Sequence, residues 1–299
     1  MQIRAILFLI IATSFWGLNF HLGKVMLHDV SFIEAGFWRY ALGVLMLWLI
    51  IGRKHTGNTR ADFKANHIGL LLVGVIGLFG FNLFFFLGLK YTSALNAALI
   101  VALNPAQTVL LDSLILRNPI QRAHKIGLLI ALAGVVILLT RGEPQKILSL
   151  ELARGDLLIL VANLVFSLHH VWVKKYSGRI PHGAFTFWTN AICLLGFVLL
   201  LPFVGVEAME KGGASFWLAA LGMGIPGTAL AYLLWNQGVV EVGAARAGFF
   251  MNVVPLATAL LAVFFGETLA WYHLYSGLLI LSGIIYSRIG IKKLGKASG

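Results

Sequence analysis

The chain has 299 residues, of which 59% are hydrophobic and only 11% are charged. An ordinary soluble domain carries about 25% charged residues, so this chain has too little charge to cover a water-facing surface. The formal net charge is +12, and the single cysteine, Cys193, excludes an intramolecular disulfide or a metal site built from several cysteines. We therefore expect a protein surrounded mainly by lipid.

Apolar runs recur between short polar connections along the whole chain. Each run has about the 17–25 residues that an α-helix needs to cross a bilayer. The first span lacks a signal-peptidase cleavage site, so we expect it to be retained. The sequence predicts ten spans with both termini on one side: 5–23, 32–52, 67–89, 94–116, 124–140, 155–173, 183–205, 214–236, 247–266 and 270–290.

Lysine and arginine are unevenly distributed between the two sides of these spans. If the N-terminus lies inside, 16 of the 23 basic residues fall on inner segments and 6 on outer ones, while Arg39 falls within the second span. Basic residues concentrate on cytoplasmic loops, so we expect a multi-pass protein of the cell inner (plasma) membrane with both termini in the cytoplasm. The positive charge is then a topology signal, and nucleic acid is not an expected partner.

An internal repeat runs through the chain with an offset of 150 residues. Each copy holds five predicted spans, an odd number, so the second copy must enter the membrane in the opposite orientation. We expect one five-helix domain over 1–145, an inverted one over 150–290 and a basic cytoplasmic tail over 291–299. Inverted repeats are the geometric basis of alternating access. Matched pairs include Phe37-Trp38 with Phe187-Trp188, Gly74 with Gly224, Gly77 with Gly227, Gly88 with Gly238, and Pro105 with Pro255.

The matched segments 94–112 and 244–262 each carry a proline eleven residues from their start, Pro105 and Pro255. Proline removes a helical hydrogen bond and clashes with the preceding turn, so it kinks a helix. In membranes such breaks are tolerated where the freed backbone lines a cavity or is buried in protein. We therefore predict two kinked helices that meet near a central site, with the prolines as hinges.

Three stretches carry a resemblance to a known family: SFWGLNFHLGK, GLKYTSALNAALIVALNP and GVVEVGAARAGFFMNVVPLATALLAVFFGETL. The chain resembles the drug/metabolite transporter superfamily, in its ten-helix branch with two EamA-type domains. The first copy departs from the pattern, with Leu116-Arg117 where the second has Gly266-Glu267. The resemblance implies an all-α membrane protein around a central cavity, peripheral fifth and tenth helices, and efflux or exchange of small organic solutes such as amino acids, metabolites or drugs.

Polar side chains inside the predicted spans are candidates for the substrate site, because they are costly in lipid and tend to face a cavity. They also join helices to one another in membrane bundles, and both interpretations stay open here. Trp16 and Asn19 share a face of the first span, and Asn19 is the repeat partner of His169. The full set of predicted substrate-binding residues is Trp16, Asn19, Asn82, Phe86, Asn104, His169, Tyr232, Trp235, Asn236 and Asn252.

Charged groups bear on how transport is coupled. Glu34, Asp112, Glu241 and Glu267 fall towards span ends, and no carboxylate falls clearly at mid-membrane. We therefore expect facilitated exchange or substrate-driven efflux without an acidic proton relay. Arg39 lies about two turns into its span, where it could bind a carboxylate or anchor a neighbouring helix.

Enzyme chemistry finds no support in the sequence. No glycine-rich phosphate loop follows a strand, and the adjacent His169 and His170 cannot share a helix face as metal ligands do. We expect no cofactor and no metal.

The best-supported function is a secondary transporter, a monomer, that exports or exchanges small organic solutes. With 21 Phe, 8 Trp and 7 Tyr, and amides in the candidate site, we expect an amphipathic substrate such as an amino acid, including aromatic ones. The alternatives are a membrane-embedded enzyme acting on a lipid-linked substrate and a solute channel.

Overall fold

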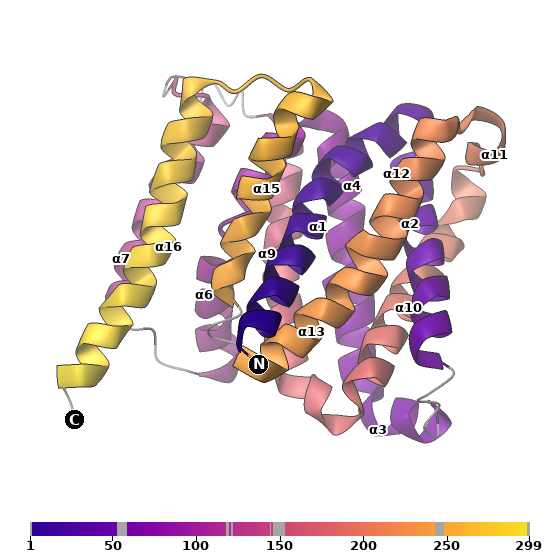
Figure 1. The fold of residues 1–299 in the computed structure, drawn as a ribbon, viewed down its shortest axis with the longest axis horizontal. Coiled ribbons are helices and arrows are strands. Elements are labelled where there is room, and N and C mark those ends of the chain that lie inside the picture. Colours follow the sequence, from indigo (N-terminus) through magenta and orange to yellow (C-terminus); the bar gives the residue numbers. More distant parts are fainter. Residues whose placement is uncertain are drawn as a thin grey trace.

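The computed structural model describes residues 2–52, 59–117, 120, 122–143, 145, 153–242 and 248–297. Within these residues the chain is helical and contains no strand, and the helices gather into one bundle (Figure 1). In chain order the α-helices are α1 (Gln2–Asp29), α2 (Phe32–Leu47), α3 (Thr59–Leu71), α4 (Phe81–Tyr91), α5 (Ala94–Val101), α6 (Asn104–Leu116), α7 (Arg122–Thr140), α9 (Arg154–Tyr176), α10 (His182–Leu200), α11 (Ala208–Lys211), α12 (Ala214–Gly224), α13 (Ala231–Val242), α15 (Val253–Ala262) and α16 (Trp271–Ala297).

Among the described residues, seven helical segments are long and apolar enough to cross a membrane. Two shorter apolar helices, Lys125–Thr140 and Phe250–Phe265, accompany them. The prediction of an all-helical, multi-pass membrane fold is confirmed, while the number of ten crossings stays a prediction. Both chain ends lie at the same end of the bundle (Figure 1). We call this end the termini side and the other end the distal side.

The first helices of the two repeats run in opposite directions. Lys24, near the end of α1, donates a hydrogen bond to the carbonyl of Thr92 at 2.8 Å. Gly155, near the start of α9, packs its Cα against the same Thr92 backbone, where an added Cβ would lie 2.6 Å from the amide nitrogen. The end of α1 and the start of α9 therefore meet on the distal side, as an inverted repeat requires.

Helix interruptions recur at matched places in the two repeats. A π-helical stretch over Leu72–Gly80 joins α3 to α4, and another over Ile225–Leu230 joins α12 to α13. Such wider turns inside helices are frequent at functional sites. They occupy nearly the same positions at the repeat offset, so the corresponding span is wound more widely at the same depth in each copy.

The prolines differ from the prediction of a kink inside a continuous helix. The helix α5 ends at Val101, and α6 begins at Asn104 with Pro105 in its first turn. In the second copy a 3-10 turn, Gly248–Asn252, precedes α15, and Pro255 again lies in the first turn. The first turn is where proline costs least, because the amide that it lacks would have no helical partner there. Each proline therefore starts a new helix, and its role as a hinge stays a prediction.

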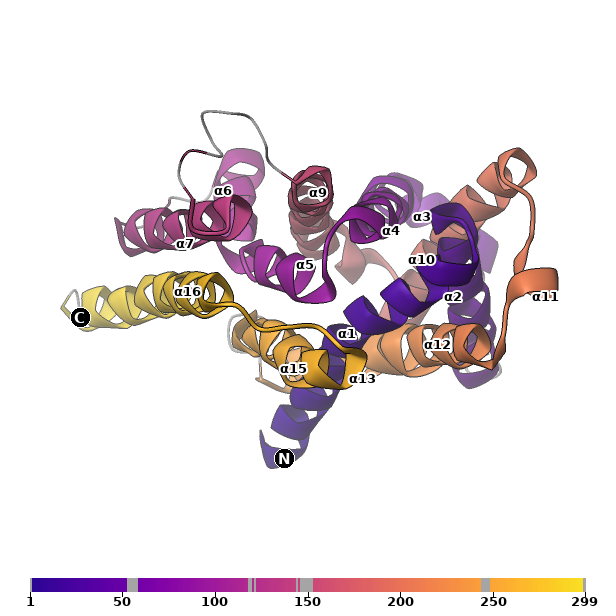
Figure 2. The same cartoon turned by 90° about the horizontal axis from the view of Figure 1, so that it is seen from above.

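Glycines allow the two repeats to cross closely. A Cβ on Gly77 would lie 2.9 Å from the Cβ of His169, and a Cβ on Gly227 would collide with the side chain of Asn19. His169 is the repeat partner of Asn19, so the same crossing is built twice. Small residues allow helices of a membrane bundle to approach closely in this way. Viewed from above, α7 and α16 lie side by side at one edge (Figure 2), which matches the peripheral place implied for the fifth and tenth spans.

Candidate functional site

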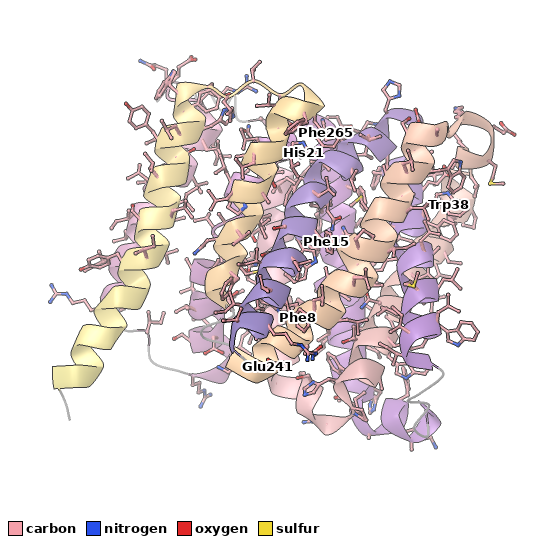
Figure 3. All side chains as sticks on the ribbon, viewed as in Figure 1. Phe8, Phe15, His21, Trp38, Glu241 and Phe265 are labelled. Atoms are coloured by element: carbon pink, nitrogen blue, oxygen red, sulfur yellow. The ribbon has the colours of Figure 1, made fainter. Side chains whose placement is uncertain are left out.

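A small cavity of about 40 Å³ lies between the two repeats. The cavity lies about halfway along the bundle. Figure 3 labels Phe15 at this depth, and Phe15 directly precedes Trp16 in the cavity wall. The cavity contains two complete repeat pairs, Trp16 with Phe166 and Val101 with Met251, so it lies where the two copies face each other. Its walls are formed by Trp16, Asn19, Phe20, Arg39, Phe81, Phe85, Val101, Phe166, Tyr232, Met251 and Val254.

Aromatic rings form most of this central cavity. The rings of Phe81 and Phe166 stack with their centroids 4.5 Å apart, and those of Phe20 and Phe85 meet edge to face at 5.2 Å. On another wall Trp16 meets Tyr232 at 5.6 Å. Offset and edge-to-face pairs of this kind add stability beyond the area they bury. The cavity therefore has rigid, apolar walls that suit an apolar or aromatic group.

Arg39 brings a positive charge to the same cavity, although only 4% of the residue is exposed. Its Nε donates to Thr228 Oγ1 at 3.2 Å, and its Nη1 donates to Asn82 Oδ1 at 2.9 Å. Both partners are neutral. Within the part of the chain that the structure describes, no carboxylate forms an ion pair with this guanidinium. The charge is held in place by hydrogen bonds but is not neutralised.

Asn82 fixes the guanidinium from behind. Its Nδ2 donates to the hydroxyl of Tyr40 at 2.7 Å and to the carbonyl of Leu78 at 2.8 Å, which leaves Oδ1 as the acceptor for Arg39. Asn82 is itself fully buried and does not line the cavity. It therefore orients Arg39 and holds its Nη1.

Asn19 supplies an acceptor beside this donor. Its Nδ2 donates to the carbonyl of Gly227 at 3.1 Å. Its Oδ1 is buried and finds no hydrogen-bond donor among the described residues. Buried polar atoms without a partner are rare, and this one lies against Gly227, 2.0 Å from where a Cβ on that glycine would stand. The cavity thus combines a cationic side chain, an amide whose oxygen is unpaired among the described residues, and apolar walls.

The predicted site residues fall into two groups. Trp16, Asn19 and Tyr232 line the central cavity, and Trp235 stands behind Trp16 with ring centroids 5.1 Å apart. Asn252 is buried beside the wall residue Met251. The side chain of Asn236 lies outside the described residues. Sequence reasoning placed Arg39 in a span but did not include it in the site. It also missed the phenylalanines of the cavity wall. Of these, Phe166 could have been found as the repeat partner of Trp16.

Besides Asn82, Trp235 and Asn252, three predicted residues do not line the cavity. Phe86 is fully buried in the apolar core and packs against Phe85. Asn104 donates to Asn163 Oδ1 at 3.1 Å and to Ser167 Oγ at 3.0 Å, so it joins α6 to α9. His169 stacks on Phe166 with centroids 5.3 Å apart. Asn104 joins helices, and so does His169, which also packs against Gly77 of the other repeat. This is the alternative that the sequence left open for the polar side chains.

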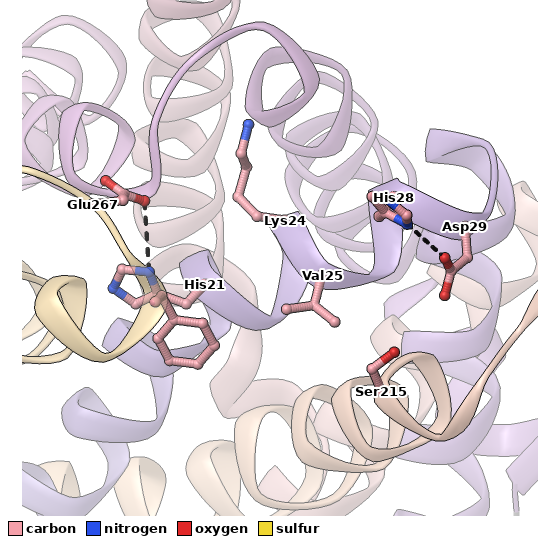
Figure 4. Close-up of a pocket in the computed structure, with 8 residues that line it drawn as sticks. His21, Lys24, Val25, His28, Asp29, Ser215 and Glu267 are labelled. Atoms are coloured by element: carbon pink, nitrogen blue, oxygen red, sulfur yellow. Dashed lines mark hydrogen bonds and ion pairs between the residues drawn. The ribbon is translucent and has the colours of Figure 1, made fainter.

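A second, larger cavity of about 360 Å³ opens on the distal side (Figure 4). Figure 3 shows His21 and Phe265 together near that end of the bundle. Sequence reasoning did not identify this cavity, because its walls combine the end of α1 with the segment that follows α15. The residues that line it are His21, Lys24, Val25, His28, Asp29, Ser215, Phe265 and Glu267.

The fold and the cavity between two inverted helical repeats define a membrane transport protein. The EamA-like transporter family matches residues 3–140 and 153–289, which together cover most of the chain. The chain therefore belongs to the EamA-like transporter family. It is a multi-pass membrane transporter and not an enzyme.

Similar proteins agree with this assignment. The chain is 29% identical over 272 residues to the uncharacterized transporter YyaM of Bacillus subtilis (strain 168), covering 91% of this chain and 89% of that one. It is 28% identical over 196 residues to the aromatic amino acid exporter YddG of Ancylobacter novellus, covering 64% of this chain and 66% of that one. A solved protein crystal structure shares the fold with a TM-score of 0.67 at 21% identity, over 97% and 98% of the two chains.

Proposed function

We propose that this transporter exports amino acids, aromatic ones among them, by alternating access through the central cavity. The observation that carries the proposal is Arg39, a buried guanidinium without a carboxylate partner in the described residues, held against aromatic walls. A charge within a membrane span is costly and marks a substrate or ion pathway by default. A substrate carboxylate would supply the missing negative charge through a charge-assisted hydrogen bond.

The remaining groups of the cavity fit the other parts of an amino acid. Asn19 Oδ1 is an unpaired acceptor, which suits the donors of an ammonium group. The rings of Phe20, Phe81 and Phe166 suit an apolar or aromatic side chain. The name of the Ancylobacter relative, an aromatic amino acid exporter, supports the same substrate class and the direction of export.

The size of the cavity supports a change of conformation during transport. A volume of about 40 Å³ holds only a few water molecules, which is too little for an aromatic amino acid. The two repeats must therefore separate before substrate enters. Inverted repeats that rock against each other around a fixed site provide such a movement.

Counterflow in proteoliposomes tests the substrate class. Vesicles are preloaded with unlabelled amino acids, and uptake of labelled phenylalanine, threonine and a cationic dye is measured. We expect saturable exchange of phenylalanine, inhibited by excess phenylalanine. Flux that rises without saturation would contradict a carrier and favour a channel, and exchange of the dye alone would contradict the amino acid proposal.

Arg39→Met tests the carboxylate contact. We expect at least a 10-fold loss of phenylalanine exchange, while Arg39→Lys keeps part of it because the charge remains. Arg4→Met is the matched control, since Arg4 is an exposed cation of the same repeat. Phenylethylamine, which lacks the carboxylate, should bind wild type and Arg39→Met equally. Equal loss of affinity for both compounds would show that Arg39 only supports the fold.

A further inference from the structure

His21 is a fully buried histidine on α1 that the central cavity does not use. Three groups of the second repeat surround its ring. Nε2 lies 2.8 Å from the carbonyl of Thr258, the ring face stacks on Phe265 with centroids 4.6 Å apart, and Nδ1 lies 3.6 Å from Oε1 of Glu267. Figure 4 shows this contact at the wall of the distal cavity.

The carbonyl of Thr258 determines which ring nitrogen carries hydrogen. A carbonyl only accepts hydrogen bonds, so Nε2 must be the donor. In the neutral ring Nδ1 is then an unprotonated acceptor, and it has no hydrogen-bond partner among the described residues. It faces the oxygen of Glu267, which is also an acceptor. Two lone pairs thus face each other in a part-buried contact that lacks one proton.

Glu267 is fixed by the first repeat. Its Oε1 accepts a hydrogen bond from the amide of Ala94 at 2.9 Å, and its Oε2 accepts one from the amide of Leu95 at 3.2 Å. These are amides of the first turn of α5, where helical partners are absent. The carboxylate therefore links the segment after α15 to α5, and His21 adds α1 to the same junction.

We propose that His21 and Glu267 together bind one proton, which closes the distal side and couples transport to a proton gradient. A proton on His21 Nδ1 converts the contact between two acceptors into a charge-assisted hydrogen bond between imidazolium and carboxylate. This bond holds the two repeats together on the distal side. Loss of the proton removes the bond and favours opening there. The proposal differs from the expectation of exchange or substrate-driven efflux without an acidic proton relay, because Glu267 lies against His21.

Most of the other charged groups around the pair, among the described residues, have partners of their own. Lys24 donates hydrogen bonds to the carbonyls of Leu89 and Thr92 at 3.0 and 2.8 Å. Its interaction with Glu267 is the electrostatic attraction of opposite charges. On α16, His273 contacts Asn96 Oδ1 at 2.9 Å. On α9, Asp156 accepts a hydrogen bond from Thr92. The remaining charged groups nearby are His28 and Asp29, which pair with each other, and Arg141 after α7.

The proton has a path to bulk water and a mechanical link to the central site. His21 and Glu267 line the distal cavity of about 360 Å³, which is open to the outside of the bundle. On α1, His21 directly follows Asn19 and Phe20, which line the central cavity, and α5 carries Val101, which lines the central cavity too. A closure at His21 and Glu267 therefore acts on two helices of the substrate site. A carrier that exports solute, takes up a proton from the distal side and releases it to the termini side after the return step is an antiporter.

The transport test rests on the proposed amino acid function, and it separates exchange from coupling. Vesicles loaded with labelled phenylalanine at pH 7.5 are diluted into buffer at about pH 7.5 or about pH 6, values that bracket histidine titration. We expect acid outside to speed wild-type efflux several-fold. His21→Gln should lose this acceleration but keep counterflow at equal pH, since the glutamine amide can still donate to Thr258. His28→Gln is the matched control, because His28 lies in the same cavity but is exposed.

A second readout detects the proton without any substrate. In ¹⁵N-histidine-labelled protein in nanodiscs, the signal absent from His21→Gln identifies His21. We expect its Nδ1 signal to move from the unprotonated to the protonated position as the pH falls from about 8 to about 5, and Glu267→Gln to alter this change. A His21 signal that stays constant over the range overturns the proposal. Saturable counterflow with no effect of the gradient on wild type also overturns it, whereas absence of all exchange overturns only the substrate proposal.

Discussion

The two repeats share their helix crossings but not their polar groups. Gly77 packs against His169 in one crossing, and Gly227 packs against the repeat partner Asn19 in the other. The same holds nearer the helix ends, where Gly88 lies against Ile159, and Gly238 lies against Leu9, the repeat partner of Ile159. Close approach needs only the absence of a Cβ, so both copies keep it.

The charged and titratable groups proposed to bind substrate and proton, in contrast, have no equivalent at the matching position of the other repeat. Arg39 corresponds to Thr189, whose hydroxyl bonds, among the described residues, to two carbonyls of its own helix. Glu267 corresponds to Arg117 at the repeat offset, and His21 corresponds to Val171. Small residues thus give both halves the same shape, and binding groups without a counterpart make the two sides of the membrane different. A carrier with a preferred direction needs such a difference.

The largest effect is expected from filling the shared crossings. Gly77→Leu and Gly227→Leu each force a side chain into a neighbouring helix, and overpacking of this kind costs about 2–3 kcal/mol. Both variants should unfold at least about 5 °C below wild type. Cys193 provides the measurement, because it is the single cysteine and is buried. Its reaction with a thiol-reactive dye during heating reports unfolding.

Gly178→Leu is the control for this pair, since nothing lies within 4 Å of a Cβ at that position. It should leave the melting temperature unchanged. If only one of the two variants, Gly77→Leu or Gly227→Leu, were destabilised, the two crossings would not be equivalent. The statement that the repeats share their helix crossings would then be wrong.

The shared features were the ones that the sequence could predict. The spans, the close glycines and the depth of the site follow from hydropathy and from the 150-residue offset. The break before Pro105 was predicted as a kink, because a proline in an apolar run gives no sign that a new helix starts beside it. The contact of His21 with Glu267 joins a residue of the first repeat to one of the second. No periodicity relates these two residues, so only the folded chain shows them together.

A medium effect is expected at the polar crossing of α9 with α5 and α6. Asn163 donates to the carbonyl of Ile100 at 3.0 Å and accepts from Asn104 at 3.1 Å. Asn163→Val removes both bonds and leaves the carbonyl of Ile100 without that donor, while Asn104 keeps its bond to Ser167. The loss should be about 1–2 kcal/mol. The same melting experiment measures the loss.

Thr13 is the repeat partner of Asn163 and provides the comparison. Its hydroxyl bonds only to the carbonyls of Leu9 and Ile10 on its own helix, at 2.7 and 3.1 Å. Thr13→Val should therefore change stability by less than about 0.5 kcal/mol, because the helix keeps its backbone bonds. An equal loss in Thr13→Val and Asn163→Val would mean that the interhelical bonds of Asn163 contribute little.

The smallest effects are expected at Lys24 and Lys174, two lysines at matching repeat positions near opposite ends of the bundle. Lys174 pairs with Asp112 at 2.9 Å, but 61% of its side chain is exposed. Exposed pairs contribute about 0–1 kcal/mol and weaken in salt, so Lys174→Met should leave the melting temperature nearly unchanged. Lys24 is half-buried and satisfies two carbonyls where α4 ends. Lys24→Met leaves both without that donor, so it should lower the melting temperature more than Lys174→Met, and high salt should not remove the difference. A larger effect at Lys174 would show that the exposed ion pair contributes more to stability than the buried hydrogen bonds at the end of α4.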